Sequence, residues 1–220
     1  MTNIILADDH VVIRHGLRLT LEELGFKVIG EASDGLEVIQ LVEKLKPDVL
    51  LCDLMMGNMN GLEVARRVSK QYPKVGIIIL SMYSDESYVI EALRAGAKAY
   101  VLKDSSAEDL QHAINEVVKG KHYLGSSLSE RAIEMYAQKT TDGIQEPFDT
   151  LSAREREILQ MVAQGMTSND ISEKLFISSR TVDAHRSKVM HKLSLHSRAD
   201  LIRFAQRRGI IPSETPFSKE

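Results

Sequence analysis

Several short apolar segments of the chain are each followed at once by a polar residue that can take part in phosphoryl chemistry. Asp8 and Asp9 follow the first segment, Asp53 follows another, and Ser81 and Lys103 follow two later ones. If these segments are parallel strands of one sheet, their carboxyl ends meet at one edge, where doubly wound sheets bind their ligands. We therefore expect these side chains to converge on a single pocket.

Such a pocket predicts a magnesium-dependent phosphoryl acceptor. Carboxylates crowded in a dry pocket need a compensating cation. Mg²⁺ suits Asp8, Asp9 and Asp53 because it takes oxygen ligands, typically one or two carboxylates with phosphate oxygens and waters. A carboxylate oxygen that remains free can attack phosphorus in covalent catalysis. Ser81 and Lys103 are suited to stabilise the charge on the phosphoryl oxygens.

A single aspartate after a strand is more often a local turn or cap residue than a ligand. Asp34 and Asp48 are interpreted in that way, and Asp9 could in part cap the first helix. The larger set is interpreted as functional because four separate strand ends each offer suitable chemistry.

The elements that must position these residues alternate along the first half of the chain. Apolar runs of strand length are followed by stretches with apolar residues three and four apart, which indicates buried parallel strands joined by helices. The predicted strands are Asn3–Ala7, Phe26–Ala32, Val49–Cys52, Gly76–Leu80 and Ala99–Leu102. This α/β pattern predicts a doubly wound, five-stranded parallel sheet with right-handed crossovers.

The second half is predicted to be a small all-α domain. A short helix is expected over Ser127–Gln138, and the polar stretch Lys139–Thr150 is interpreted as a linker. Ser152 and Glu155 form a capping-box pattern at the start of the next helix. Three further helices are expected, about Ser168 to Leu175, Ser179 to Leu193 and Ser197 to Arg208.

Charge divides the chain in the same place. Residues 1–123 hold 14 Lys and Arg against 18 Asp and Glu, a net of −4, whereas residues 147–212 hold 11 against 7, a net of +4. The basic half is thus the candidate nucleic-acid binder. No apolar run is long enough to span a membrane, and Cys52 is the only cysteine. These features favour a cytoplasmic protein without disulfides or a structural zinc site.

The first half resembles the receiver domain of response regulators. The resemblance covers about the first 120 residues and rests on Ile4-Ile5-Leu6-Ala7-Asp8-Asp9-His10, Asp48-Val49-Leu50-Leu51-Cys52-Asp53, Ile79-Leu80-Ser81 and Tyr100-Val101-Leu102-Lys103-Asp104. It implies a flavodoxin-like fold and a phosphoryl group accepted on Asp53 from a sensor histidine kinase. It also implies that Met55 lends its backbone carbonyl to the magnesium site. Tyr100 would be an aromatic switch that moves inward when Ser81 turns toward the phosphate.

One position departs from the receiver pattern. The family usually has Pro four residues after the phosphoryl-accepting Asp, and this chain has Gly57. Since Gly leaves the backbone angles freer than Pro does, we hypothesise a more mobile loop and an altered lifetime of the acyl phosphate.

The helix expected over Ser179–Leu193 has the composition of a DNA-recognition helix. It combines the apolar residues Val182 and Val189 with four basic ones, which are Arg180, Arg186, Lys188 and Lys192. Such a helix can pack by one side and lie in a major groove by the other. Charge alone would also fit a solvated basic face.

This half resembles the LuxR-type DNA-binding domain. The matching runs are Leu151-Ser152-Ala153-Arg154-Glu155-Arg156-Glu157-Ile158-Leu159, Ala163-Gln164-Gly165 and Ile177-Ser178-Ser179-Arg180-Thr181-Val182-Asp183-Ala184-His185. Joined to a receiver, this domain indicates the NarL/FixJ family of regulators. The resemblance implies that Asp183, Ala184 and Ser187 face bases. The residues better placed for phosphates are Thr181, Arg186, Lys188 and Lys192. It also implies homodimers that pair through a receiver face and the helix around Ser197–Phe204.

The sequence thus predicts a receiver over 1–123, a linker over 124–146, a DNA-binding domain over 147–212 and a flexible tail over 213–220. Its predicted role is transcription control by phosphorylation, without multiple-turnover enzyme activity beyond slow self-dephosphorylation. Two alternatives stay open. One is a phosphatase or phosphotransferase with an aspartate nucleophile. The other is a phosphorylation-independent DNA binder whose receiver serves only for dimerisation.

Overall fold

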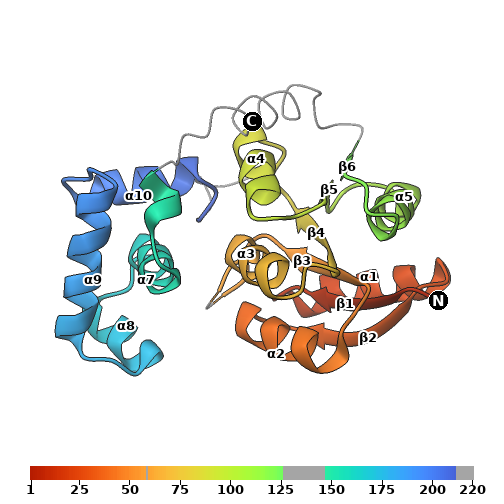
Figure 1. Cartoon of the computed structure of the whole chain (residues 1–220), viewed down its shortest axis with the longest axis horizontal. Coiled ribbons are helices and arrows are strands. Elements are labelled where there is room, and N and C mark those ends of the chain that lie inside the picture. The colour runs from red at the N-terminus through yellow and green to blue at the C-terminus, as the bar shows by residue number, and fades with distance from the viewer. Residues whose placement is uncertain (58, 126–146, 212–220) are drawn as a thin grey trace. The chain divides into compact units, whose positions relative to one another are not determined.

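The computed structural model describes residues 1–57, 59–125 and 147–211 (Figure 1). Its internal contacts divide the chain into two compact units, Met1–Gln138 and Lys139–Glu220. The short helix predicted over Ser127–Gln138 and the predicted tail over 213–220 lie outside the described residues.

The first unit is built on a parallel sheet with the strand order β2-β1-β3-β4-β5-β6. Its strands are β1 (Asn3–Ala7), β2 (Lys27–Ala32), β3 (Val49–Asp53), β4 (Gly76–Ser81), β5 (Ala99–Leu102) and β6 (Tyr123–Leu124). Five of them were predicted within a residue of their bounds. The sixth was not, because two residues are too short to show a strand pattern. Leu124, which was assigned to the linker, pairs with Tyr100 of β5.

Alternate residues of each strand face opposite sides of the sheet, and both sides are buried. Ile5, Leu50 and Ile77 belong to one apolar cluster, which also contains residues of α2 (Gly35–Leu45), α3 (Gly61–Gln71) and α4 (Glu86–Arg94). Ile4 and Leu51 belong to the other, with residues of α1 (Val11–Glu23) and α5 (Ala107–Val118). This two-sided burial explains why the inner strands β1, β3, β4 and β5 are mostly apolar, whereas the edge strand β2 carries exposed Lys27 and Glu31.

The interpretation of Asp34 as a local cap residue is confirmed, whereas Asp48 makes a structural contact with a residue distant in sequence. Asp34 is the N-cap of α2 and accepts hydrogen bonds from two backbone amides of its first turn. Asp48 accepts one from the backbone amide of Asn3 at 2.7 Å. Asp9 does not cap α1, because the N-cap residue there is His10, whose side chain makes no capping bond. The carboxylate of Asp9 is thus left for other contacts.

The second unit is helical. It comprises a 3-10 turn η1 (Pro147–Thr150) and the helices α7 (Ala153–Ala163), α8 (Ser168–Leu175), α9 (Ser179–Lys192) and α10 (Arg198–Arg207). Ser152 and Glu155 form the predicted capping box of α7. The interpretation of the whole stretch Lys139–Thr150 as linker is wrong at Phe148, which lies in η1 and is buried in the core of this unit, whereas the domain start proposed at 147 includes this residue. A single aromatic residue in a polar stretch gave too weak a pattern to show this.

None of the helices described here is long and apolar enough to cross a membrane.

Candidate functional site

The carboxyl edge of the sheet gathers the residues predicted for phosphoryl chemistry. Asp8 and Asp9 directly follow β1, and Asp53 is the last residue of β3. Ser81 ends β4, and Lys103 follows β5. β2 lies on one side of β1 and β3 on the other, so the strand order reverses there. The loops that follow β1 and β3 therefore lead away from each other at Asp8 and Asp53. A doubly wound sheet forms its ligand crevice at such a point.

An ammonium group joins the two innermost carboxylates. Nζ of Lys103 lies 2.7 Å from Oδ2 of Asp8 and 3.1 Å from Oδ2 of Asp53. Asp8 is fully buried, and Asp53 is 3% exposed. Buried charges persist only when they are paired. The loops after three different strands are therefore held together by one cation.

The surroundings change how these groups bind protons. Burial raises the pKa of Asp53 to about 6, although the charge of Lys103 opposes this rise. Burial lowers the pKa of Lys103, but the charges of Asp53 and Asp8 outweigh burial and leave it above its ordinary value. Near neutral pH the pair is thus an ammonium beside a carboxylate that is more basic than an ordinary aspartate.

The same edge offers a donor set for a divalent cation. Ligand atoms of Asp8, Asp9, His10 and Asp53 all lie within 4.8 Å of one another. Carboxylate oxygens suit hard cations such as Mg²⁺, and the exposed Asp9 leaves room for the waters that Mg²⁺ keeps. The backbone amide of Met55 donates to the carboxylate of Asp53. The residues present therefore fit the predicted metal.

His10 was missed by sequence reasoning. Its Nδ1 lies 2.8 Å from Oδ1 of Asp9, and its backbone amide donates to Oδ1 of Asp8 at 2.8 Å. His10 therefore helps to hold the carboxylates of Asp8 and Asp9 in place. Its place directly after them in the sequence was the one available signal.

The two predicted switch residues are connected through the backbone of a third residue. The hydroxyl of Ser81 accepts a hydrogen bond from the amide of Tyr83 at 3.0 Å. The hydroxyl of Tyr100 donates to the carbonyl of Tyr83 at 2.7 Å. Tyr100 is fully buried, so it already occupies the inward position in this structure. The ring of Tyr83 stacks on that of Tyr88 at 5.1 Å.

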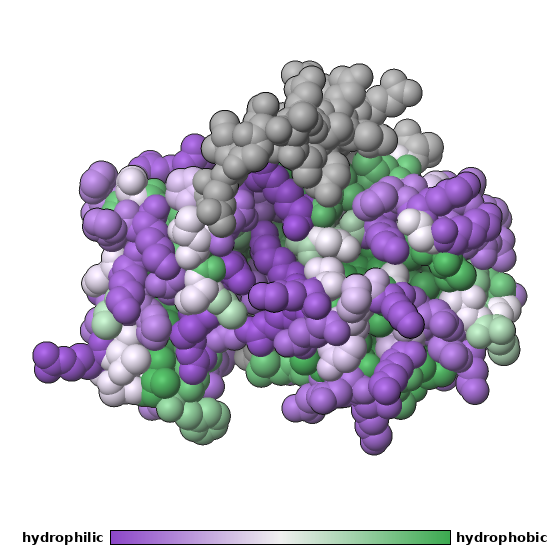
Figure 2. All heavy atoms as spheres, in the orientation of Figure 1, coloured by the Kyte–Doolittle hydropathy of each residue, from purple (hydrophilic) through white to green (hydrophobic). Residues whose placement is uncertain are grey.

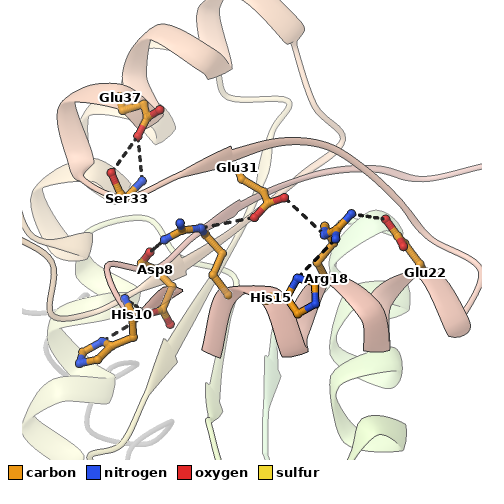
Figure 3. A network of polar contacts seen from close by, with 9 residues as sticks. Asp8, His10, His15, Arg18, Glu22, Glu31, Ser33 and Glu37 are labelled. Carbon is orange, nitrogen blue, oxygen red and sulfur yellow. Dashed lines mark hydrogen bonds and ion pairs between the residues drawn. The ribbon is translucent and has the colours of Figure 1, made fainter. Parts of the chain in front are cut away.

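A charged network connects the pocket to α1 (Figure 3). Arg14 donates to the backbone carbonyl of Asp8 and pairs with Glu31 of β2 at 3.4 Å. Glu31 also pairs with Arg18, at 3.5 Å, and Arg18 in turn pairs with Glu22 at 3.7 Å. The spacing of 14, 18 and 22 on one helix face could have predicted part of this network.

Two glycines near the pocket differ in what they allow. A Cβ at Gly61 would collide with the carbonyl oxygen of Asp53, so only glycine lets α3 begin so close to the end of β3. A Cβ at Gly57 would meet nothing within 4 Å. The Pro that is usual at this second position would therefore find space.

A second candidate site is the outer face of α9. Val182 and Val189 are buried, whereas Arg180, Ala184 and Lys188 are exposed. Thr181, Arg186 and Ser187 are exposed as well. Figure 2 shows mainly hydrophilic side chains over the edge of the second unit where α9 runs. α9 therefore packs by one side and presents polar and basic groups on the other, as a groove-binding helix requires.

Several of the predicted DNA-contacting residues make contacts inside the second unit, among them Lys192 and Asp183. Nζ of Lys192 lies 2.7 Å from the carboxylate of Glu155, which is 4% exposed, and 3.0 Å from the carbonyl of Thr150. Asp183 accepts a hydrogen bond from the hydroxyl of Ser168 at 2.7 Å and lies 3.3 Å from Arg186. Lys192 thus has a scaffold role that its charge alone did not reveal.

Comparison with known proteins matches both units. Residues 4–115 match the family described as the response regulator receiver domain. Residues 149–205 match the family described as bacterial regulatory proteins, luxR family. The chain belongs to the NarL/FixJ family of response regulators. The chemistry predicted for this pocket is therefore the chemistry of a known class of regulator.

Several relatives of this response regulator extend over nearly its whole length. The oxygen regulatory protein NreC of Staphylococcus haemolyticus is 39% identical over 213 residues, which cover 94% of this chain and 98% of that protein. NreC of Staphylococcus epidermidis is 38% identical over 214 residues with the same coverage. RcsB from Salmonella enterica serovar Typhimurium, solved bound to a promoter with a phosphomimetic, is 27% identical with a TM-score of 0.56. That match covers 94% of this chain and 99% of RcsB.

Proposed function

We propose that this response regulator accepts a phosphoryl group on Asp53 from a sensor histidine kinase and that phosphorylation changes its binding to DNA. The observation that carries the proposal is the contact of Lys103 with both Asp8 and Asp53 at the carboxyl edge of the sheet. It supports a pocket that already holds a nucleophilic carboxylate beside a cation.

In the proposed transfer, an oxygen of Asp53 attacks the phosphorus of a phosphohistidine. A phosphorus–oxygen bond forms as the phosphorus–nitrogen bond breaks, and the electron pair returns to the imidazole of the kinase. Asp8, Asp9, Asp53 and the carbonyl of Met55 would hold Mg²⁺, which when bound offsets negative charge on the phosphoryl oxygens. Lys103 is near enough to donate to one of these oxygens. Slow attack by water would return Asp53 to its free state.

The signal would leave the pocket through Ser81. In this structure its hydroxyl accepts a hydrogen bond from the Tyr83 amide, and Tyr83 also receives the hydroxyl of Tyr100. If Ser81 turns to donate to the phosphoryl group, it releases Tyr83 and loosens the hold on Tyr100. This shifts the populations of the segment before α4. We propose that the shift favours homodimers through a receiver face and α10.

The target is double-stranded DNA read in the major groove by α9. Exposed Arg180, Thr181 and Lys188 are suited to phosphates, and Ala184 and Ser187 to base edges. A homodimer would bind two half-sites and so gain affinity. We infer a cytoplasmic location, where a kinase's phosphoryl donor and DNA are both within reach. The domain bounds of 1–123 and 147–212 are part of the proposal, with the buried Phe148 supporting the second start.

A second candidate function is DNA binding that does not depend on phosphorylation. The observation that favours it is the burial of Tyr100, whose hydroxyl is already bonded to the carbonyl of Tyr83. A switch that is inward before phosphorylation leaves less movement for phosphorylation to produce.

One experiment separates the two candidates. DNA binding is measured at fixed salt for the wild type and Asp53→Ala, each with and without a small phosphodonor and Mg²⁺, because phosphate contacts make affinity depend steeply on salt. Tightening by donor and Mg²⁺ in the wild type alone supports the phosphorylation switch. Equal binding under all conditions supports the second candidate. Turnover of a phosphorylated small molecule would instead favour an enzyme.

A further inference from the structure

A cavity of about 420 Å³ lies beside α9, on a flank that the predicted DNA contacts only partly use. Its apolar lining is made by Val162, Met166, Met190 and Leu201, of which Val162 and Leu201 are buried. It is enclosed by residues from the end of α7, the start of α8, α9 and the start of α10. All of these residues lie within the second unit.

The rim of this cavity carries the positive charge of two arginines, with a histidine beside them. Arg186, His196 and Arg198 line it, and no acidic residue does. Among the described residues, neither Arg198 nor His196 makes a side-chain ion pair, and both are exposed. The nearby Asp183 is already bonded to Ser168 and lies 3.3 Å from Arg186. The charge that remains at the rim therefore suits an anion.

The place of the cavity on α9 indicates which anion. An α-helix with its side chains is about 10–12 Å wide, and the major groove is about 12 Å wide. A helix lying in that groove therefore has a sugar–phosphate strand along each flank. Exposed Ala184 and Ser187 mark the middle of the outer face, and Lys188 extends toward one flank. Arg186 and Met190, four residues apart, form the other flank, where the cavity opens.

We propose that this cavity seats one sugar–phosphate unit of bound DNA, with Arg198 and His196 as phosphate contacts outside the helix-turn-helix. A nucleotide backbone unit joins an anionic phosphate to the apolar face of a deoxyribose, which matches a positively charged rim over an apolar lining. The inference rests on the proposed DNA-binding function and extends it to the start of α10. It gives α9 a cationic contact on both flanks, which fixes its orientation in the groove.

The side chains carry this site, not the helix ends. The N-cap Thr167 of α8 exchanges hydrogen bonds with Asp170, and the N-cap Ser197 of α10 bonds with Asp200. The first-turn amides of these helices are thus partly satisfied within the protein. Within the part of the chain that the structure describes, Arg198 has no such partner, so its guanidinium is available to a phosphate.

The test uses the full chain and a generic DNA duplex, because phosphate contacts do not depend on base sequence. Affinity is measured over a range of salt concentrations for the wild type, Arg198→Ala and Arg207→Ala. Arg207 is the matched control, since it is exposed, lies on the same helix and does not line the cavity. We expect Arg198→Ala to weaken binding about tenfold and to lower the salt slope by about one, with Arg207→Ala near wild type.

Four further measurements test the proposal. Arg198→Lys keeps the charge and should restore the salt slope, and the thermal midpoint of Arg198→Ala should stay unchanged. The oligomeric state of each variant shows whether a loss comes from α10 pairing. Lys188→Ala tests the proposed function separately. If Lys188→Ala lowers the salt slope and Arg198→Ala behaves like Arg207→Ala, the proposed phosphate site in the cavity is wrong, but DNA binding by α9 is supported. If neither the wild type nor any variant binds DNA, both the proposed DNA-binding function and the proposed phosphate site are wrong.

Discussion

The two candidate sites use charge in opposite ways. In the receiver pocket, the side chains of Asp8, Asp53 and Lys103 are almost entirely shielded from solvent, and the one ammonium lies 2.7 and 3.1 Å from the two carboxylates. On α9, Arg180 and Lys188 are exposed, and neither makes an ion pair among the described residues. The first site is assembled before any ligand arrives, whereas Arg180 and Lys188 of the second have no acidic partner in the described part of the chain.

This difference has a physical cause. A phosphoryl acceptor needs a basic carboxylate, and burial provides it by raising the pKa of Asp53. A DNA-binding surface gains affinity by replacing counterions on phosphates, and this requires cations that no acid of the protein already holds. Mutations in the receiver pocket should therefore change the stability of the protein, whereas mutations on the outer face of α9 should change its affinity for DNA.

The largest effect is expected from Lys103→Gln. Removal of the buried ammonium leaves Asp8 and Asp53 facing each other without a cation, so we expect a loss of about 3 kcal/mol of stability without metal. Chemical denaturation with a chelator present measures this loss, and Mg²⁺ should reduce it. Lys188→Gln serves as the exposed control and should change stability by less than about 0.5 kcal/mol. Equal losses in the two variants would contradict the contrast between the sites.

Asp53→Asn should stabilise the metal-free protein by about 2 kcal/mol near neutral pH. The raised pKa of Asp53 means that the folded state holds its proton more tightly than the unfolded chain does. Its ionisation therefore costs stability as pH rises from about 4 through about 6. Denaturation of both proteins across this range should show a difference that vanishes at the acidic end. A constant difference would mean that another effect of the substitution dominates.

Lys192 combines features of both sites. It is a basic residue of α9, as in the DNA-binding surface, but it pairs with the buried Glu155, as charges do in the receiver pocket. Burial raises the pKa of Glu155, but bonds from Lys192 and Ser152 outweigh burial and lower it. Because a lowered pKa stabilises the fold above the ordinary pKa, Lys192→Ala should cost about 1 kcal/mol at neutral pH and less in acid. Thermal unfolding against pH measures this.

The matching DNA measurement compares Lys192→Ala with Lys188→Ala. Lys188→Ala should lower the salt slope by about one, and Lys192→Ala should lower it less. Equal salt slopes for the two variants would support the phosphate contact predicted for Lys192.

The smallest effect is expected from Gly57→Pro. A side chain at this position meets open space, so stability should change by less than about 1 kcal/mol. The half-life of the acyl phosphate, followed after removal of the phosphodonor, tests the hypothesis that Gly57 alters it. An unchanged half-life would refute that hypothesis.

Most of the framework could be predicted from the sequence, because its signals are local. Buried strands must be apolar over their whole length, and Asp8, Asp53, Ser81 and Lys103 stand directly at strand ends. Once parallel strands are inferred, the geometry of the sheet brings those ends together. The capping box of Ser152 and Glu155 is equally local, since its partners are three residues apart.

What only the tertiary structure decided depends on partners distant in sequence. Lys192 and Glu155 are 37 residues apart, so no spacing rule connects them. The strand β6 forms because its two residues pair with β5. Phe148 is buried because it packs in the apolar core of the second unit. The inward place of Tyr100 and the cavity beside α9 likewise follow from packing. Sequence determined which groups could do chemistry, and packing decided which charges are neutralised and which stay free, because neutralisation requires contact.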